Sequence, residues 1–317
     1  MGIYLVFKKT FYDMLGLKRN IAIVSLVVLA LVLYCSIEWI NGLKAEAISS
    51  TPTSLTLQTQ FIADRIIFIW YIWGAGLLLT ILASANAAGF ISKEVTDGTL
   101  MLVVNKPINR YEIIMGKLLA LIVNSVMLMA IAYLFSILLL WGILPLDVDS
   151  FEALFGLMPY MLLYAFIVTL FFGSISIALS TLMNSRVKIV IISMALIMYT
   201  FFIGVLLRFA VDREGSNLYA NLSIYSIDTG YHISNTFYLI SNDIEFWDIS
   251  PSQQYFLGGF TGTYHILGNS DYNAQLGEIH YSNPTDYVHP AYSLLIVLGI
   301  SASAVALAMW GLHRKQL

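Results

Sequence analysis

Four of the five histidines lie in one stretch near the C-terminus, close in sequence to three acidic residues, and together they raise the question of a metal site. Imidazole and carboxylate groups are common metal ligands, but zinc sites usually place pairs of ligands at short, fixed spacing. The sequence has no C-x-x-C or H-x-x-x-H pair, so surface histidines are the favoured interpretation and no metal site is predicted. The residues considered are His232, His265, His280, His289, Asp271, Glu278 and Asp286.

Catalysis by a side chain of this protein is not predicted either. An intramembrane hydrolase needs a nucleophile with a base in reach, yet no long apolar stretch has a histidine in its core, and no G-x-S-x-G sequence occurs. The P-loop sequence G-x-x-x-x-G-K-[ST] is also absent, so the chain is expected to bind no nucleotide through such a loop. The single cysteine, Cys35, leaves no partner for an intrachain disulfide.

The composition predicts that much of the chain lies in a lipid bilayer. Of the 317 residues, 59% are hydrophobic and 11% are charged, and the mean hydropathy is +0.80. In soluble proteins about a quarter of the residues are charged. The net charge of −3 is small, and nucleic acid is not an expected partner.

Six apolar stretches are long enough to cross about 30 Å of hydrocarbon as α-helices. We therefore predict an all-α integral membrane protein with six transmembrane helices. The first stretch is too long for the core of a signal peptide and has no small-x-small cleavage site, which predicts a retained signal anchor. The predicted spans are 21–40, 66–88, 118–144, 157–182, 189–207 and 291–312.

Basic residues are distributed unevenly between the loops, and this predicts the orientation. Twelve of the sixteen Lys and Arg residues precede span one, follow span six, or lie between spans two and three or four and five. By the positive-inside rule these loops and both termini are cytoplasmic, and the predicted location is the plasma membrane. Before span one, Ile3, Phe7, Phe11 and Met14 recur near helical spacing, which predicts an amphipathic helix on the cytoplasmic leaflet.

The long segment between spans five and six is predicted to form a compact extracytoplasmic subdomain, because its aromatic residues could supply a small core. The predicted organisation is 1–208 for the first five spans, with the N-terminal helix and a cytoplasmic loop at 89–117, then 209–290 for the subdomain and 291–317 for span six and the cytoplasmic tail. The aromatic residues are Phe237, Tyr238, Phe246, Trp247, Tyr255, Phe256 and Phe260.

The spans lack the polar features of an ion-driven carrier. Such carriers usually keep an ionisable residue or a broken helix near the middle of the bilayer. Glu38, Arg65 and Arg208 fall at span ends, where long side chains are expected to reach the interface. Asn86 and Asn124 lie inside spans, where a hydrogen bond to a neighbouring helix is the favoured interpretation.

Small residues mark two spans as sites of close helix packing. Gly173 and Ser176 belong to a small, polar side of span four, and Gly299 and Ser303 stand at small-x-x-x-small spacing in span six. Helices in a bilayer can approach each other closely where a residue has no Cβ or only a short side chain. These four residues are therefore predicted to mediate helix packing.

The cytoplasmic loop between spans two and three carries the strongest pattern, and from residue 89 it reads GFISKEVTDGTLMLVVNKPINRYEIIMGKLLA. Apolar residues interleave with charged ones such as Lys93 and Glu94, so the segment can lay one face on a surface. A D-G pair ending at Gly98 breaks the helix, and an N-K-P sequence makes a turn. Asn109 can then cap a new helix in a capping box with Glu112. The pattern predicts a helix–turn–helix elbow in the cytosol.

This loop resembles the first cytoplasmic loop of ATP-binding-cassette type-2 exporter permeases, through the sequences E-x-x-x-G-T-L and K-P-I-x-R-x-E-I-x-x-G-K. Six spans with both ends inside and a basic amphipathic start extend the resemblance over most of the chain. The long external segment is the exception, since it is commonly shorter in that family. The matching residues are Glu94, Gly98, Thr99, Leu100, Lys106, Pro107, Ile108, Arg110, Glu112, Ile113, Gly116 and Lys117.

The resemblance implies a permease that pairs with a second copy of itself and with two separate ATPase subunits, which bind ATP and Mg and dock on the elbow. This chain would then hold no cofactor and would not be an enzyme. ATP-driven movement of the docked elbows would export a substrate that the sequence does not identify. The ATPase-coupling residues implied are Lys93, Glu94, Gly98, Thr99, Lys106, Pro107, Ile108, Arg110 and Glu112.

Two alternatives remain open at this stage. One is a permease that transports nothing and relays ATP-driven motion to an extracytoplasmic partner, which the large external segment favours. The other is a membrane assembly protein that recruits a partner without any ATPase. Co-purification with an ATPase subunit would discriminate against the second alternative.

Overall fold

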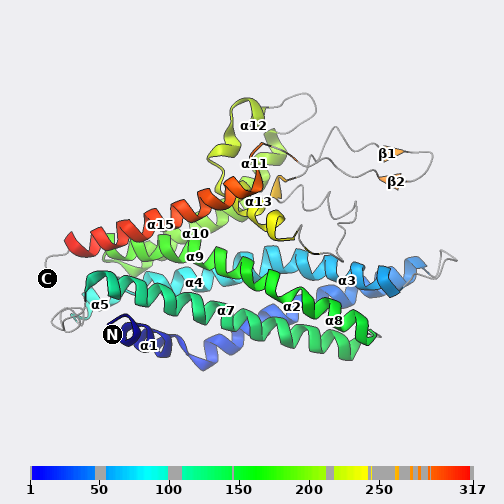
Figure 1. The fold of residues 1–317 in the computed structure, drawn as a ribbon, viewed down its shortest axis with the longest axis horizontal. Coiled ribbons are helices and arrows are strands. Elements are labelled where there is room, and N and C mark those ends of the chain that lie inside the picture. Colours follow the sequence, from blue (N-terminus) through cyan, green and yellow to red (C-terminus); the bar gives the residue numbers. More distant parts are fainter. Residues whose placement is uncertain are drawn as a thin grey trace.

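The computed structural model describes most of the chain as helices arranged in one bundle (Figure 1). The described residues are 2–46, 55–98, 109–144, 146–211, 218–241, 244, 261–263, 272–273, 278–279, 285 and 287–314. The helices of the first half are α1 (Gly2–Met14), α2 (Leu17–Glu46), α3 (Leu55–Ile69), the π-helical segment η1 (Trp70–Leu79), α4 (Thr80–Ala88), α5 (Ser92–Thr96) and α7 (Arg110–Ile143).

The second half begins with two helices that meet at a short break and ends with the last long helix. Its helices are α8 (Val148–Gly156), α9 (Met158–Leu182), α10 (Arg186–Met198), the π-helical segment η2 (Tyr199–Ile203), α11 (Gly204–Val211), α12 (Leu218–Asn221), the short 3-10 turn η3 (Ile224–Ser226), α13 (Thr229–Ser241) and α15 (Pro290–Arg314). Two two-residue strands, β1 (Tyr272–Asn273) and β2 (Glu278–Ile279), pair antiparallel.

Six helical stretches of the described chain are long and apolar enough to cross a membrane, which confirms the predicted all-α, six-span fold. They extend beyond most ends of the predicted apolar runs, and most of all at the start of the fourth, because polar residues at the ends continue the helix. The spans are Lys18–Ile40, Ile62–Thr96, Arg110–Ile143, Val148–Leu182, Arg186–Arg208 and Pro290–Arg314.

Two spans contain π-helical segments that the sequence analysis does not predict. Such segments are uncommon and often lie at functional sites. In η1, Gly76 packs against the carbonyl oxygen of Tyr71 so closely that a Cβ would collide with it. In η2, Phe201 lies beside the same glycine, at 3.1 Å from the position a Cβ would take. The two π-helical segments therefore meet at a place where glycine permits the close approach.

The apolar core is richest around α9, which packs against α15, α4 and α7. Large aromatic side chains from several spans are fully buried there, including Trp70, Tyr133, Tyr164 and Phe171. Trp70 stacks edge-on against Tyr133, with ring centroids 5.2 Å apart, and its indole N–H donates to the carbonyl of Met161 at 3.1 Å. Burying the indole is favourable because its one polar group has found a partner.

Helix α13, from the segment between spans five and six, belongs to the main core. It packs against α15 and α9, and ten of its thirteen residues are buried. Phe237 packs against Tyr71 with tilted rings and against Tyr164 edge-on, with ring centroids 4.7 Å apart in both pairs. The prediction that Phe237 and Tyr238 supply a separate subdomain core is therefore wrong, because both pack against the core of the bundle. Phe246, Trp247, Tyr255, Phe256 and Phe260 lie outside the described residues.

Helices α1 and α5 and the last turn of α15 lie at one end of the bundle, hereafter the elbow end (Figure 1). The buried side chains of α1 are Val6, Thr10 and Met14, which are spaced four residues apart and so share one helix face. The helix is amphipathic as predicted, although the face buried against the protein differs from the predicted stripe. Tyr4, Leu5 and Tyr12 of α1 are exposed.

Candidate functional site

The elbow between spans two and three is held in place by the end of α9. The hydroxyl of Ser180 accepts hydrogen bonds from the main-chain N–H groups of Ile91 and Ser92, each at 3.0 Å, and donates to the carbonyl of Ala88. These contacts satisfy the N–H groups at the start of α5, which a helix leaves without internal partners. Helix α5 ends at Thr96, and Gly98 follows with φ +68°, the left-handed region that favours glycine.

Glu94 connects α5 to two other helices. Its carboxylate lies 2.7 Å from the Nζ of Lys117 in α7 and 3.7 Å from the Nζ of Lys9 in α1. The Lys117 ammonium also donates to the carbonyl of Phe90 at 2.5 Å and lies 5.6 Å from the centre of its ring. Lys117 has a side chain only 5% exposed, so the pair with Glu94 compensates for a buried charge.

The start of α7 is a capping box, as predicted from its sequence. The Asn109 side chain accepts from the third N–H of the helix, and the Glu112 carboxylate accepts from the Asn109 N–H at 2.9 Å. Arg110 is the first residue of α7, and its guanidinium donates to the carbonyls of Leu312 and His313 at 3.0 and 2.7 Å. These two carbonyls end α15, so Arg110 ties the elbow to the last span.

Helix α1 packs closely on α7 because of one glycine. A Cβ at Gly116 would lie 2.9 Å from the carbonyl oxygen of Ile3 and 2.9 Å from the Cβ of Val6. Only a residue without a side chain allows this approach. Together with the Lys9–Glu94 contact, it makes α1, α5 and α7 one packed unit at the elbow end.

The structure brings several of the predicted coupling residues together. Lys93 is exposed on α5, Glu94 faces inward to Lys117 and Lys9, and Gly98 lies two residues after the end of the helix. Arg110 and Glu112 are occupied by contacts within the chain. Thr99, Lys106, Pro107 and Ile108 lie outside the described residues. Sequence reasoning missed Lys9 and Lys117 as partners of Glu94, although Lys117 stands in the matched motif.

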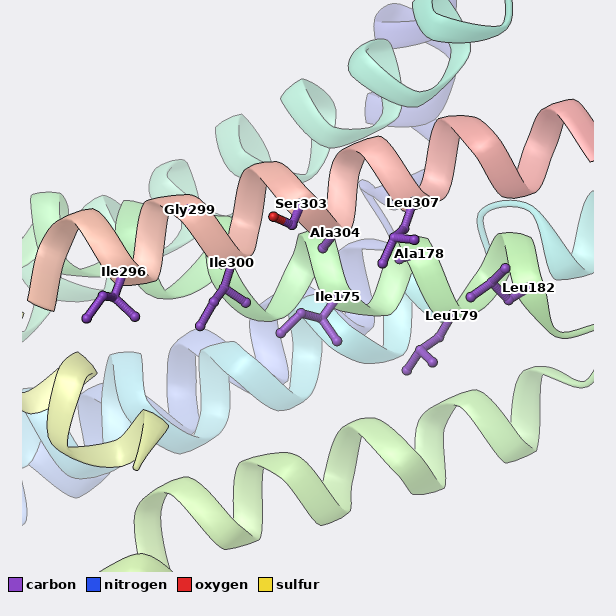
Figure 2. A pocket seen from close by; sticks show the side chains of 10 residues that line it. All are labelled: Ile175, Ala178, Leu179, Leu182, Ile296, Gly299, Ile300, Ser303, Ala304 and Leu307. Carbon is purple, nitrogen blue, oxygen red and sulfur yellow. The ribbon is translucent and has the colours of Figure 1, made fainter. Parts of the chain in front are cut away.

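The small residues of spans four and six have different surroundings. A Cβ at Gly173 would lie 2.6 Å from Leu121 in α7, and the hydroxyls of Ser176 and Ser193 in α10 are 2.9 Å apart, so this side of α9 lies against its neighbours. Gly299 and Ser303 instead line an apolar groove of about 520 Å³ between α9 and α15 (Figure 2). Within the described chain, nothing lies within 4 Å of a Cβ built at Gly299.

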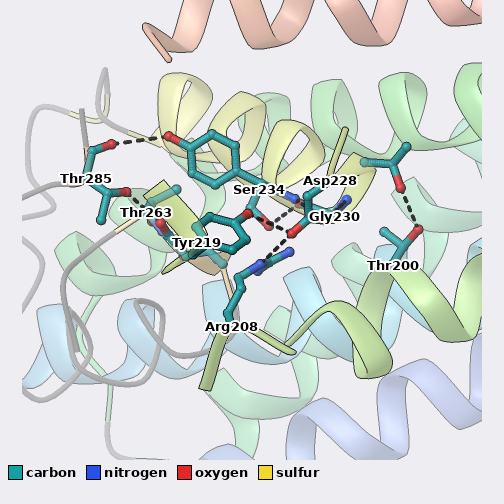
Figure 3. A network of polar contacts seen from close by, with 12 residues as sticks. Thr200, Arg208, Tyr219, Asp228, Gly230, Ser234, Thr263 and Thr285 are labelled. Carbon is teal, nitrogen blue, oxygen red and sulfur yellow. Dashed lines mark hydrogen bonds and ion pairs between the residues drawn. The ribbon is translucent and has the colours of Figure 1, made fainter. Parts of the chain in front are cut away.

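A buried ion pair lies near the far end of span five (Figure 3). The Nε of Arg208 is 2.9 Å from the Asp228 carboxylate, and both side chains are 3% exposed. The Tyr219 hydroxyl donates to the same carboxylate at 2.9 Å, and the N–H of Gly230 donates to its other oxygen at 2.9 Å. The prediction that Arg208 reaches the membrane interface is wrong, since the segment after span five folds back over it.

The environment of Asp228 favours its charged form. Burial by itself raises the pKa of the carboxyl, but the Arg208 guanidinium and the hydrogen bonds from Arg208 and Tyr219 outweigh it and hold the pKa below its ordinary value. Gly262, at φ +69°, lies against Arg208, and a Cβ there would be 2.8 Å from its Cδ. The arginine is therefore enclosed by main chain from two separate segments.

Other polar residues also depart from the sequence-based interpretation. Within the described chain, neither the nitrogen nor the oxygen of the Asn124 side chain has a hydrogen-bond partner, nor does the Asn86 nitrogen, so the predicted bonds to neighbouring helices are absent. Burying such polar groups without partners is unfavourable in any apolar environment.

The two other charged residues at span ends are Arg65 and Glu38. Their side chains lie 3.9 Å apart and form an ion pair with each other.

The histidine cluster does not assemble in the described part of the chain. His232 is 2% exposed in α13, with one ring nitrogen 3.1 Å from the Ser293 hydroxyl and the other 3.1 Å from the Ser226 carbonyl, so it is not a surface histidine. His289 is exposed. His265 and His280 lie outside the described residues, and among those that are described no group of three metal-ligand side chains occurs.

The comparison with protein families identifies the architecture. A family model described as ABC-2 family transporter protein matches residues 4–317, nearly the whole chain. A comparison with curated proteins gives no match. The match covers the elbow, all six spans and the segment between spans five and six, so the chain belongs to the ABC-2 family of transporter proteins and is a permease of an ABC-type transporter.

Proposed function

We propose that this permease forms an ATP-driven exporter with a separate ATPase subunit that docks on the elbow. The observation that carries the proposal is the set of ties that join α5 to the rest of the bundle. Glu94 contacts Lys117 in α7 and Lys9 in α1, while Arg110 holds the end of α15. A force applied to α5 therefore acts on three further helices through polar contacts.

The mechanism follows from the rigidity of this unit. ATP can shift the permease only if the nucleotide-bound ATPase holds one arrangement of the elbow better than the other. A stiff connection is needed because the coupling must pass through a contiguous physical network. The Glu94–Lys117 pair supplies that connection inside the bundle, while the exposed Lys93 is a contact for the ATPase surface.

The assembly we propose contains two permease chains and two ATPase subunits, which bind ATP and Mg. The elbow end and both termini face the cytoplasm of a plasma membrane, because the basic loops gather there. Residues 209–290 then lie on the opposite side, and the part of them that forms α13 returns into the bundle. The groove at Gly299 and Ser303 is a contact surface for the second permease chain in this assembly.

A relay without transport is the second candidate, and one observation favours it. The Arg208–Asp228 pair and the packing of α13 against α15 and α9 bind the extracytoplasmic segment firmly to the spans. Motion of the spans would thus be passed to that segment. A transport assay in vesicles that contain the permease together with its ATPase separates the two candidates. A permease that only relays motion should hydrolyse ATP through its ATPase without moving any solute.

Docking is tested by cross-linking from a single cysteine. In a Cys35→Ser background, Lys93→Cys should react through a short bifunctional maleimide with the co-purified ATPase, because Lys93 is exposed on α5. Lys188→Cys serves as the matched control, since Lys188 is an exposed basic residue of α10 outside the elbow. Equal cross-linking at both positions, or none at Lys93→Cys, would contradict docking on the elbow.

A further inference from the structure

A polar cleft of about 420 Å³ lies at the elbow end, between α1, the start of α2, the end of α4, α5, α7 and the start of α10. Five basic and three acidic side chains line it, so its formal charge is positive. Glu94, which compensates Lys117, is one of the three acids. The basic residues are Lys9, Arg19, Lys93, Lys117 and Arg186.

In the orientation proposed above, the cleft opens at the depth of the inner headgroup layer. Arg186 is the first residue of span Arg186–Arg208, and Arg19 is the second residue of span Lys18–Ile40. The hydrocarbon begins where these apolar helices begin, so both guanidinium groups stand at the boundary between lipid and water. Helix α1, which forms one wall, runs beside the same boundary with Leu5 and Tyr12 exposed.

Donors in the cleft remain available for an anion. Arg19 gives one hydrogen bond to the carbonyl of Met14 at 2.8 Å, and Arg186 gives one to the carbonyl of Ala85 at 3.3 Å. A guanidinium has five N–H donors, so each has several left. Asn86, which is only 9% exposed, also lines the cleft, and within the described chain its side-chain N–H₂ has no partner.

An unpaired donor among cations fits an anionic ligand, because phosphate oxygens accept hydrogen bonds and carry negative charge. An apolar groove of about 650 Å³ between α2 and α7 starts at Leu15 and Asn20, the chain neighbours of the cleft residues Met14 and Arg19. A cationic cleft at headgroup depth with an apolar groove next to it along the chain favours a phospholipid over a free phosphate ion.

We propose that this cleft binds the phosphate headgroup of an anionic phospholipid from the cytoplasmic leaflet. Arg19 and Arg186 hold the phosphate oxygens from two helices, and the Asn86 amide donates from the floor. The bound lipid then bridges α2 and α10 beside α1. The site requires the permease chain alone, so its test is independent of whether an ATPase docks on the elbow.

The test measures lipid retention by the purified full-length chain. The protein is reconstituted in phosphatidylcholine nanodiscs containing a minor fraction of phosphatidylglycerol, then released and weighed by native mass spectrometry. The double variant Arg19→Gln with Arg186→Gln should bind phosphatidylglycerol about thirtyfold more weakly, given the contribution of each of the two basic residues near an anionic surface. Asn86→Leu should weaken retention by a smaller factor.

The matched control is Lys18→Gln with Lys188→Gln. It removes the same charge from the same two helices at exposed positions that do not line the cleft. This control should retain phosphatidylglycerol as the unmodified chain does, and phosphatidylcholine should not be retained by either. Equal loss in both double variants would show diffuse surface attraction instead of a site and overturn the proposal.

Two further outcomes would also overturn it. Displacement of the lipid by millimolar inorganic phosphate would assign the cleft to a soluble anion. Full retention of phosphatidylglycerol by the Arg19→Gln, Arg186→Gln variant would leave the cleft to a protein partner, such as an acidic segment of the ATPase. Circular dichroism and size-exclusion profiles of each variant establish that loss of lipid does not reflect loss of fold.

Discussion

Lys117 and Glu94 form an ion pair at 2.7 Å that joins α7 to the elbow helix α5, although they are separated by the whole elbow loop in the sequence. Lys9 of α1 lies beside this pair, with its ammonium 3.7 Å from the Glu94 carboxylate. Three helices that move together in the proposed coupling mechanism thus share one charged centre. Because Lys117 is buried, the pair also has consequences for stability.

Glu94→Gln should destabilise the permease by roughly 2–4 kcal/mol, because it leaves the buried Lys117 ammonium without its counter-charge. Thermal unfolding of the purified chain in detergent measures this effect. The double variant Glu94→Gln with Lys117→Met should recover most of the stability, since neither charge then remains to be compensated. ATP turnover of the assembled complex should stay reduced in the double variant. Recovery of both properties together would contradict a role of the pair in coupling.

Gly116→Ala should displace α1 from α7, because the added Cβ would lie 2.9 Å from the Ile3 carbonyl and the Val6 side chain. Overpacking of this kind destabilises by about 1–3 kcal/mol. Amide hydrogen exchange in α1 should accelerate. Gly142→Ala is the control on the same helix, since nothing lies within 4 Å of its Cβ position, and it should leave α1 protected. Similar exchange in both variants would refute the close contact.

Arg110→Ala should loosen the end of α15, because the guanidinium bonds to the last carbonyls of that helix. Charge-assisted bonds of this type contribute about 1 kcal/mol when they are partly exposed to solvent. The expected readout is faster hydrogen exchange at residues 310–314. Arg110→Lys keeps the charge but not the two-pronged geometry and should rescue only part of the protection. Unchanged exchange in Arg110→Ala would mean that the contact is not formed in the membrane.

Asp228→Asn should destabilise the protein at neutral pH by about 3 kcal/mol, because it leaves the buried Arg208 unpaired. The pKa of Asp228 is held below its ordinary value, so the stability from its charge is present above about pH 4 and is lost as the pH falls through the lowered value. The difference in melting temperature between the unmodified protein and the Asp228→Asn variant should therefore shrink on acidification. Asp149→Asn, at an exposed position of α8, should cause no such change. A difference independent of pH would contradict the ion pair.

The spans are predictable from the sequence because a run of about twenty apolar residues has few soluble alternatives. Their ends are less predictable, since the helix that Asn109 caps is predicted as part of a cytoplasmic elbow, yet it continues without a break into span three. The capping box at Asn109 is visible in the sequence, but the partners that hold Arg110 and Lys117 are distant along the chain. Local polarity alone cannot distinguish a charged helix end from a loop.

The candidate site is predictable in outline but not in its contacts. The motif around Glu94 locates the elbow, and Gly98 and the Asn109 cap have local signatures that the structure bears out. Arg208 illustrates the limit, because a charged residue at the end of a span suggests an interfacial anchor. Its partner Asp228 lies twenty residues further on, across a segment that folds back only through tertiary packing.

Co-purification is the direct test of whether an ATPase docks on the elbow. The tagged chain is isolated from native membranes in mild detergent, its partners are identified by mass spectrometry, and the eluate is assayed for vanadate-sensitive ATP hydrolysis. A P-loop ATPase is expected in a one-to-one ratio with the permease, together with ATP turnover in the eluate. A chain that purifies without any such ATPase, and without ATP turnover, would contradict the coupling function of the elbow.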